Sequence, residues 1–472
     1  MTLRVLSVAS ECVPLVKTGG LADVAGALPA ALAPEDIDVA TLLPAYPAVI
    51  DAAGDLKPSA ELGVLFGGPA RILRGQMGEH ALFLLDAPHL FERPGKIYLG
   101  PDGEDWLDNP IRFAALSLAA ARMAAQDVAG WAPQVLHLHD WQAGLTPIYL
   151  RQMGAADRIG TLMTIHNIAF QGLAPASLLD ELSLPRANFN PQGYEFYGKI
   201  SALKAGLVYA DKISTVSPTY ARELMTEQFG MGFDGVLRTR KADLSGILNG
   251  IDEEIWSPPY KTARGKAAHK KALRNHMGLP EAPGPLLVVV SRLTEQKGLD
   301  MLLAAMPAFL DAGGQVAVLG TGDPKLEAAF EDAAKRHDNV AAEITYNEDL
   351  ARLLIMGGDV IAVPSRFEPC GLTQLYGLRF GTLPLVALTG GLADTVIPAN
   401  VAARMAGVAT GFQFYPVTAR GLSDTLGQVV TAYKNTKLWA KMQKNAMRHP
   451  VGWSASAGAY GALLRSLVKT SA

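Results

Sequence analysis

Short apolar segments alternate with longer amphipathic or alanine-rich segments along most of the chain. In the first half we predict strands at the short apolar segments and helices between them. The predicted strands are residues 3–9, 38–43, 81–85, 135–139 and 161–165, and the predicted helices are residues 21–32, 111–126, 141–153 and 219–229. Because this alternation is typical of parallel βα units, the first half is predicted to be a doubly wound α/β domain.

The same alternation starts again after Asn249-Gly250 and a polar stretch at residues 257–276. Further strands are predicted at residues 286–291, 315–319, 340–345, 360–363 and 384–387. We therefore predict a first Rossmann-like domain at residues 1–247 and a second at 248–453. A final helical pattern lies in residues 454–472. Packing on the first domain and packing on the second are the two alternatives for this helix.

Composition excludes several classes of protein. The chain has 472 residues, a net charge of -3 and only two cysteines, Cys12 and Cys370. A chain without a basic field is not expected to bind nucleic acid, and two cysteines cannot form a disulfide framework. The longest apolar stretch, residues 113–130, is interrupted by polar residues and is too short to cross a membrane. No secretory signal precedes the first strand, so a cytoplasmic protein is expected.

One short motif occurs twice. The sequence Thr-Gly-Gly-Leu-Ala-Asp stands at residues 18–23 and again at 389–394, each time after a predicted strand and at the start of a helix. Two such units indicate two similar sheets, with ligands at the carboxyl ends of their strands. Coincidence is the alternative, because Thr-Gly-Gly is also ordinary turn chemistry.

The first copy of the motif follows a lysine. Gly19 and Gly20 let backbone N–H groups approach an anion, the helix N-terminus adds partial positive charge, and Lys17 adds a full charge. Residues 17–20 are therefore a candidate phosphate-binding turn. An exposed lysine before a glycine turn is the alternative interpretation.

Polar side chains end two neighbouring strands of the first domain. His137, His139 and Asp140 end one strand, and His166 and Asn167 end the next. A zinc site is disfavoured because no third ligand has suitable spacing. We interpret Asp140 and His166 as hydrogen-bonding partners of a hydroxylated ligand, with a helix N-cap role for Asp140 as the alternative.

The second domain has two cations in one strand-to-helix loop. Arg292 and Lys297 lie five residues apart after the strand at 286–291. Arginine offers a planar fork to phosphate oxygens and lysine a compact charge, so the pair suits a diphosphate. A solvated loop is the alternative.

Another loop follows the strand at residues 360–363. Its Gly371-Leu372-Thr373 turn opens a helix whose free N–H groups can bind a phosphate. Glu368 lies in the same loop and could bind sugar hydroxyls or offset positive charge at an anomeric carbon. Cys370 is expected to be a small packed group rather than a nucleophile. Tyr346, beyond another strand, could stack on a base or simply pack.

Two other kinds of chemistry find less support. Asp36 and Asp38 have the spacing of metal-assisted nucleotide-sugar enzymes, but they lead into a strand instead of leaving one. No metal site is therefore predicted. Gly320-Thr321-Gly322 lacks the third glycine of the dinucleotide fingerprint, which disfavours a nicotinamide dehydrogenase.

Seven motifs, in this order, resemble the glycogen and starch synthase family of glucosyltransferases nearly end to end. They are Lys-Thr-Gly-Gly-Leu-Ala-Asp-Val at 17–24, His-x-His-Asp-Trp at 137–141, Thr-x-His-Asn at 164–167, Val-Ser-Pro-Thr-Tyr-Ala at 216–221, Asn-Gly-x-Asp at 249–252, Ser-Arg-Leu-Thr-x-Gln-Lys-Gly at 291–298 and Pro-Ser-Arg-Phe-Glu-Pro-Cys-Gly-Leu-Thr-Gln at 364–374. The resemblance is closer to the bacterial members than to the plastid ones.

The resemblance implies a GT-B fold, in which two Rossmann-like doubly wound domains face a deep cleft. It further implies transfer of glucose from ADP-glucose to the non-reducing end of glycogen or another α-1,4-glucan, with retention of configuration, release of ADP and no metal or other cofactor. The roles it implies are donor binding by Lys17, Thr18, Gly19, Gly20, Asn249, Arg292, Lys297, Tyr346, Cys370, Gly371, Leu372 and Thr373, catalysis by Glu368, His166 and Asp140, and sugar contacts by Asp23, Trp106 and Asn167.

Two residues depart from the family pattern. Trp106 stands where relatives often have tyrosine, and Leu388 stands where arginine is expected before the second Thr-Gly-Gly. The second departure weakens an anion-binding role for that turn. A UDP-glucose-dependent transferase of the same fold and a non-catalytic glucan-binding protein are the alternative functions, and the oligomeric state is left open.

Overall fold

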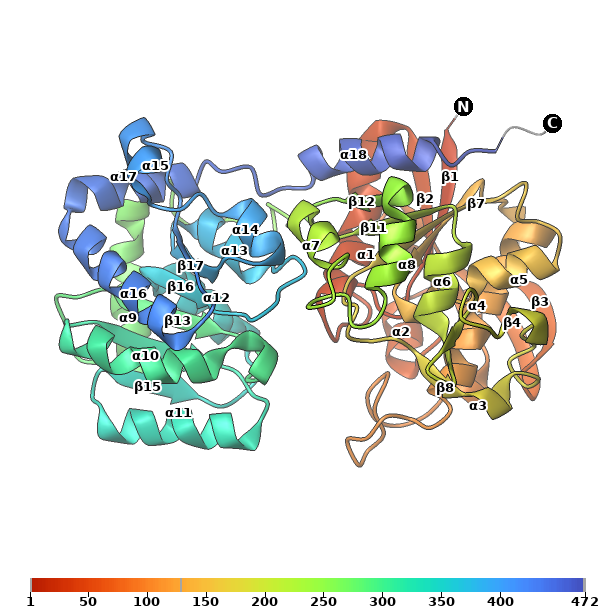
Figure 1. Ribbon diagram of the computed structural model, residues 1–472, viewed down its shortest axis with the longest axis horizontal. Helices are drawn as coiled ribbons and strands as arrows, with labels where there is room; N and C mark the ends of the chain where they lie inside the picture. The colour runs from red at the N-terminus through yellow and green to blue at the C-terminus, as the bar shows by residue number, and fades with distance from the viewer. Residues whose placement is uncertain (1, 128–129, 470–472) are drawn as a thin grey trace. The chain divides into compact units, whose positions relative to one another are not determined.

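The computed structural model describes residues 2–127 and 130–469. Residues 128 and 129 of the predicted apolar stretch, residue 1 and residues 470–472 therefore lie outside the described part. The chain forms two compact units (Figure 1). The first contains the chain up to Val216, Ala221–Asn249 and the segment from Trp453 onward, and the second contains Ser217–Tyr220 and Gly250–Gly452. Four residues of the 216–221 motif thus belong to the second unit.

In the described part of the first unit, the main sheet has nine strands. In spatial order they are β12 (Leu244–Gly246), β11 (Lys212–Thr215), β7 (Gly160–Ile165), β6 (Val135–His139), β1 (Leu3–Val8), β2 (Ile37–Pro44), β5 (His80–Asp86), β4 (Gly68–Met77) and β3 (Lys57–Leu65). The strands from β12 to β5 run parallel, as predicted for βα units.

Strands β4 and β3 extend this sheet, with β4 antiparallel to β5 and β3 antiparallel to β4, a feature that the sequence did not predict. The pair lies at the sheet edge, where one face of each strand meets solvent. Register shifts in β3 between Pro58 and Ala60 and between Glu61 and Gly63 interrupt its alternation of buried and exposed residues. The period-two signal that identifies a half-buried strand is therefore lost.

The helices described in the first unit differ from two of the predicted ones and include four that were not predicted. They are α1 (Gly20–Leu32), α2 (Pro47–Ala52), α3 (Pro88–Phe91), α4 (Asn109–Gln126), α5 (Thr146–Gln152), α6 (Ala202–Tyr209), α7 (Pro218–Glu223, which begins in the second unit), α8 (Asp234–Thr239) and α18 (Ser454–Arg465). The predicted helix 141–153 is split into a 3₁₀ turn and α5, because Gly144 packs directly on the Ala202 carbonyl. The predicted helix 219–229 ends at Glu223, whose carbonyl accepts the Thr226 hydroxyl.

Helix α18 packs against α1 in the first unit (Figure 1). Tyr460 and Leu464 of α18 are fully buried and share a core with Val24 and Leu28 of α1. Arg465 also donates to the Glu35 carbonyl. The last helix therefore returns to the unit in which the chain starts. None of the described helices is both long and apolar enough to cross a bilayer.

The second unit is a doubly wound domain with an all-parallel sheet among its described residues. Its strands, in spatial order, are β15 (Val340–Glu343), β14 (Gln315–Leu319), β13 (Leu286–Val290), β16 (Val360–Val363), β17 (Leu383–Ala387) and β18 (Phe412–Phe414). Its helices are α9 (Lys266–Met277), α10 (Leu299–Asp311), α11 (Pro324–Arg336), α12 (Glu348–Gly357), α13 (Thr373–Phe380), α14 (Gly390–Thr395), α15 (Val401–Ala406), α16 (Ala419–Lys434) and α17 (Thr436–Ala446).

Each main sheet reverses its strand order at one point. In the first unit this switch lies between β1 and β6, and in the second between β13 and β16. At such a point the loops that leave the two central strands run to opposite faces of the sheet, which opens a crevice at the strand ends. Ligand-binding side chains are therefore expected on the loops after β1, β6, β13 and β16.

A buried lysine ties α9 to the sheet of the second unit. Lys266 is 5% exposed, and its Nζ donates to the Met356 carbonyl at 2.7 Å and to Thr382 Oγ1 at 2.6 Å. Burial lowers the pKa of this amine to about 7. The folded protein therefore releases this proton near neutral pH, whereas the unfolded chain holds it up to about pH 10.4.

Lys266→Met is expected to change the pH dependence of stability. Between about pH 7 and pH 8.5 the unfolded wild type binds one proton more than the folded form, so its free energy of unfolding should rise with pH relative to the variant, by at most about 1.4 kcal/mol per pH unit. Urea unfolding of both proteins at matched pH values measures this difference, in which all other titrating groups cancel. A difference independent of pH would contradict the expectation.

Candidate active site

In the second unit, two loops at the switch point join a lysine to a glutamate. Lys297 lies on the loop after β13 and Glu368 on the loop after β16. The Lys297 Nζ is 2.6 Å from Glu368 Oε2, which also accepts the Ser365 hydroxyl at 2.8 Å. Glu368 is 7% exposed. The carboxylate is thus fixed by two donors and buried beside a cation.

The second Thr-Gly-Gly turn packs against this glutamate. A Cβ on Gly390 would overlap the Glu368 carbonyl oxygen, and one on Gly391 would overlap the Cys370 carbonyl oxygen. The Gly391 amide donates to the Glu368 carbonyl at 3.2 Å. This copy of the motif therefore needs glycine for the close approach of two backbones, which accounts for it without a bound anion.

Residues 370–373 lead into α13 as the sequence predicted for a helix start. Cys370 is buried, as expected for a packed group, and Gly371 has a φ of 72°. Gln374 Nε2 donates to the carbonyl oxygens of Cys370 at 3.0 Å and Gly371 at 2.9 Å. Leu372 is the N-cap residue, and Thr373 is the first residue of the helix, with no side-chain cap on its N–H groups. Gln374 therefore ties the amide end of α13 to the Cys370–Gly371 backbone, which follows Glu368 in the same loop.

Two other predicted donor residues of the second unit lie on its surface. Arg292 is exposed, and no ion pair of its guanidinium is found among the described residues. Tyr346 is 75% exposed, and its hydroxyl donates to Glu348 Oε1 at 2.7 Å. Both follow strands of the sheet, but neither belongs to the buried Lys297–Glu368 cluster. Their roles stay predictions.

In the first unit, the turn after β1 already holds a carboxylate. Glu11 is 4% exposed, and its Oε2 accepts the amides of Thr18 at 2.5 Å and Gly19 at 2.9 Å. Of the two amides expected to approach a ligand anion, that of Gly19 is thus bonded inside the turn, and donor binding by Lys17, Thr18, Gly19 and Gly20 stays a prediction. Lys17 pairs with Asp23 at 2.8 Å across the same turn. Gly20 begins α1.

Glu11 was missed in the sequence, although an acid three residues beyond a buried strand could have been noticed. Its other oxygen, Oε1, accepts the Tyr98 hydroxyl at 3.2 Å. One carboxylate therefore joins the 17–20 turn to the loop that precedes α4. The shape of the turn depends on this carboxylate.

Glu11→Gln is expected to loosen the 17–20 turn. The single carbonyl oxygen of glutamine can still accept the Thr18 and Gly19 amides, but these hydrogen bonds lose the charge of the carboxylate, which should lower the free energy of unfolding by about 1–2 kcal/mol. Chemical unfolding and proteolysis within the turn measure the change. Tyr98→Phe removes the hydrogen bonds of the hydroxyl with Glu11 Oε1 and Ser10 Oγ but leaves both turn amides bonded to Oε2, so it is the control for the turn itself. Wild-type stability in Glu11→Gln would show that the carboxylate does not hold the turn.

A buried histidine cluster lies at the ends of β6 and β7. His139 Nδ1 is 2.9 Å from His166 Nε2, and His137 Nε2 is 2.7 Å from Thr164 Oγ1. Burial lowers the pKa of His139 to about 3 and holds the pKa values of His137 and His166 well below 6.5. The three imidazoles are therefore neutral near pH 7 and suited to hydrogen bonds with uncharged hydroxyl groups.

Asp140 fixes the backbone beside this cluster. Its Oδ1 accepts the amides of His166 at 2.7 Å and Asn167 at 3.4 Å. Burial raises the pKa of Asp140 to about 7 despite these hydrogen bonds. The structure thus brings together Asp140, His166 and Asn167. The Asp140 side chain does not cap the 3₁₀ turn that follows it, contrary to the alternative interpretation.

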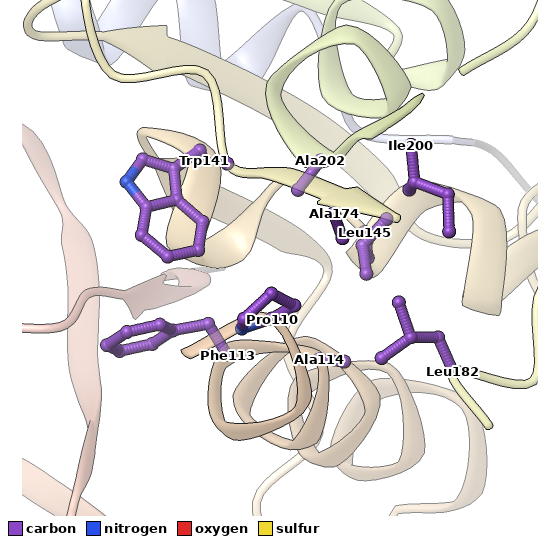
Figure 2. A pocket seen from close by; sticks show the side chains of 10 residues that line it. Pro110, Phe113, Ala114, Trp141, Leu145, Ala174, Leu182, Ile200 and Ala202 are labelled. Carbon is purple, nitrogen blue, oxygen red and sulfur yellow. The ribbon is translucent and has the colours of Figure 1, made fainter. Parts of the chain in front are cut away.

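Trp141 anchors the turn after Asp140 in apolar surroundings. Figure 2 shows its ring above Phe113 and Pro110, beside Leu145 and Ala202. The Trp141 and Phe113 ring centroids are 5.0 Å apart in an edge-on arrangement. The cavity that these side chains enclose measures about 10 Å³, so it has no room for a sugar. The packing of Trp141 on Phe113 instead holds the turn that follows Asp140.

Two remaining predicted residues of the first unit have buried atoms without a partner in the described part of the chain. Asn249 is 8% exposed and its Oδ1 accepts no hydrogen bond, and the Trp106 Nε1 has no acceptor. The Trp106 ring faces the guanidinium of Arg93, 4.7 Å from its centroid. The cation explains how the indole is held, whereas its contact with a sugar stays a prediction.

Metal binding and dinucleotide binding, the two other chemistries considered from the sequence, have no matching site in the described ranges. No three His, Cys, Asp or Glu side chains there could hold one metal ion. Gly320 and Gly322 lie against the carbonyl oxygens of Ser291 and Leu293, so close packing on the loop after β13 accounts for them.

Two α/β units with largely parallel sheets, each with polar loops at its switch point, define a glycosyltransferase of the GT-B type. Residues 4–239 match the starch synthase catalytic domain family, and residues 284–427 match the glycosyl transferases of group 1. The chain belongs to the bacterial glycogen synthase family. Both the fold class and the family expected from the sequence are confirmed.

Individual relatives cover nearly the whole chain. A glycogen synthase of Paracoccus denitrificans is 66% identical over 98% of this chain and 99% of its own length, and one of Jannaschia sp. is 54% identical over 99% of both. The catalytic domain of starch synthase IV from Arabidopsis thaliana, solved bound to ADP and acarbose, matches with a TM-score of 0.88 and 30% identity over 100% of both chains. A sucrose-phosphate synthase from Thermosynechococcus elongatus, 19% identical with a TM-score of 0.62 over 98% of this chain and 99% of its own, shares the fold.

Proposed function

We propose that the protein transfers glucose from ADP-glucose to the non-reducing end of an α-1,4-glucan such as glycogen, with retention of configuration and release of ADP. Glucosyl transfer follows from the family. The nucleotide and the polymer are supported by the solved relative, which was bound to ADP and acarbose. The observation that carries the proposal is the buried Lys297–Glu368 pair at the switch point of the second unit.

In this proposal the second unit binds the leaving nucleotide. Arg292 and Lys297 bind the diphosphate oxygens, and the amide end of α13 adds partial positive charge. Positive charge develops at the glucose C1 as its bond to the diphosphate breaks, and Glu368 offsets that charge. No metal or other cofactor is needed to neutralise the diphosphate.

Retention is proposed to occur by substitution on one face of the sugar. The bond between C1 and the diphosphate breaks while the oxygen of the acceptor 4-hydroxyl bonds to C1. The departing phosphate oxygen accepts the proton of that hydroxyl. A double displacement would need a free carboxylate against the anomeric carbon. Glu368 Oε2 already accepts two hydrogen bonds and Asp140 Oδ1 accepts two amides, which supports the single-face route. Neutral His166 is assigned to hydroxyl groups of the sugars.

The test is incorporation of labelled glucose into glycogen from ADP-glucose and, separately, from UDP-glucose, each with a chelator. We expect ADP-glucose to support transfer, an α-anomeric product and no inhibition by the chelator. Equal use of UDP-glucose would overturn the nucleotide assignment. Glycogen binding without transfer from either donor would favour a glucan-binding protein.

A further inference from the structure

Three large apolar side chains of the first unit are exposed on neighbouring loops. Tyr197 is 83% exposed, Phe170 55% and Met231 39%. Phe170 lies three residues beyond Asn167, and its amide donates to the Asn167 carbonyl at 3.2 Å. We call Phe170, Tyr197 and Met231 the apolar platform. It continues directly from the His166–Asn167 segment of the candidate active site.

Packing and hydrogen bonds join these three loops. Gln171 Nε2 donates to the Met231 carbonyl at 3.0 Å, which links the Phe170 loop to the Met231 loop. A Cβ on Gly232 would lie 3.6 Å from the Tyr197 ring, so the Met231 loop also touches the Tyr197 turn. Beneath them the Phe196 ring packs on Phe233 with centroids 4.4 Å apart. The platform thus rests on a packed aromatic base.

The backbone indicates that these exposed side chains serve a purpose. Tyr197 turns the chain between β9 (Glu195–Phe196) and β10 (Lys199–Ser201), with a φ of 47° followed by 78° at Gly198. Met231 and Gly232 have φ values of 47° and 88°. Positive φ at both central residues favours Asn-Gly, not Tyr-Gly or Met-Gly. A bulky residue costs about 1–2 kcal/mol there, and such strain with an exposed apolar side chain is typical of a functional surface.

We propose that the apolar platform binds glucose units of the α-1,4-glucan acceptor, beyond the unit that receives the new glucose. This inference rests on the proposed function. Pyranose rings present apolar C–H faces that pack on aromatic rings, and a thioether adapts to their uneven surface. The platform begins four residues after His166, which is assigned to sugar hydroxyl groups. A chain that ends there therefore has an apolar surface along which to extend.

The test uses substitutions that suit the turn. Tyr197→Asn removes the ring but favours the left-handed backbone, Tyr197→Phe keeps the ring, and Met405→Asn changes an exposed apolar side chain of the second unit. Calorimetry with maltoheptaose should give a Kd about tenfold higher for Tyr197→Asn and unchanged for the two controls. For Tyr197→Asn, the KM for glycogen should rise while the KM for ADP-glucose and kcat at saturating glycogen stay constant. Thermal melts check folding.

Each outcome decides the proposal. Equal maltoheptaose affinity in the wild type and Tyr197→Asn would overturn the platform, and so would a wild type that does not bind maltoheptaose. A loss of affinity in Tyr197→Asn that Tyr197→Phe does not share supports it. A wild type that binds maltoheptaose through Tyr197 but transfers no glucose would refute the proposed function and leave the platform standing.

Discussion

Glu368→Gln is expected to lower kcat by more than about 100-fold, a loss of about 2.7 kcal/mol of transition-state stabilisation. The side chain keeps its shape but loses the charge that Lys297 Nζ approaches to 2.6 Å and that the Ser365 hydroxyl also meets. In a buried position this charge acts on a developing cation with little screening by water. The KM for ADP-glucose should change much less than kcat. Steady-state transfer to glycogen measures both constants.

Asp300→Asn is the matched control for this variant. Asp300 also pairs with a cation, Arg366, at 2.7 Å, but the two side chains are 48% and 36% exposed. Exposed ion pairs contribute at most about 1 kcal/mol, so kcat should stay within about threefold of the wild type. If Glu368→Gln also turns over within threefold of the wild type, Glu368 has no part in the chemical step.

The buried sheets could be predicted well from the sequence, for a physical reason. The predicted strands at 315–319 and 360–363 coincide with β14 and β16, because strands covered on both faces are continuous apolar runs. The first strand of the antiparallel edge at 57–77 was missed because register shifts interrupt its alternation of buried and exposed residues. Strand β18 was missed because three residues, Phe412–Phe414, give too little pattern.

The candidate site was predictable loop by loop but not contact by contact. Sequence order placed Lys297 and Glu368 on loops at strand ends, yet 71 residues separate them, and nothing local shows that they meet. The same limit explains Glu11, which occupies the amides assigned to a ligand. It also explains the second Thr-Gly-Gly, where close backbone packing imitates an anion-binding motif. Spacing identifies where polar groups gather, whereas the tertiary structure decides which of them already bind one another.

The second large effect is expected from a single methyl group. Gly390→Ala should lower the free energy of unfolding by about 3 kcal/mol, because its Cβ would overlap the Glu368 carbonyl oxygen and its φ of 44° disfavours alanine. Relief of the overlap requires the turn and the Glu368 backbone to move apart. Folded Gly390→Ala should therefore also lose kcat by more than about tenfold. Urea unfolding and transfer assays measure the two effects.

Gly427→Ala is the control for the same chemical change. Gly427 lies inside α16, and a Cβ there would meet no described heavy atom within 4 Å beyond its chain neighbours and the backbone of its own helix. Alanine should stabilise this helix by about 0.5–1 kcal/mol and leave kcat unchanged. If the free energy of unfolding falls in Gly390→Ala and rises in Gly427→Ala, the loss comes from the contact with Glu368 and not from the added methyl group itself. Wild-type stability and turnover in Gly390→Ala would show that the turn does not hold the Glu368 backbone in place.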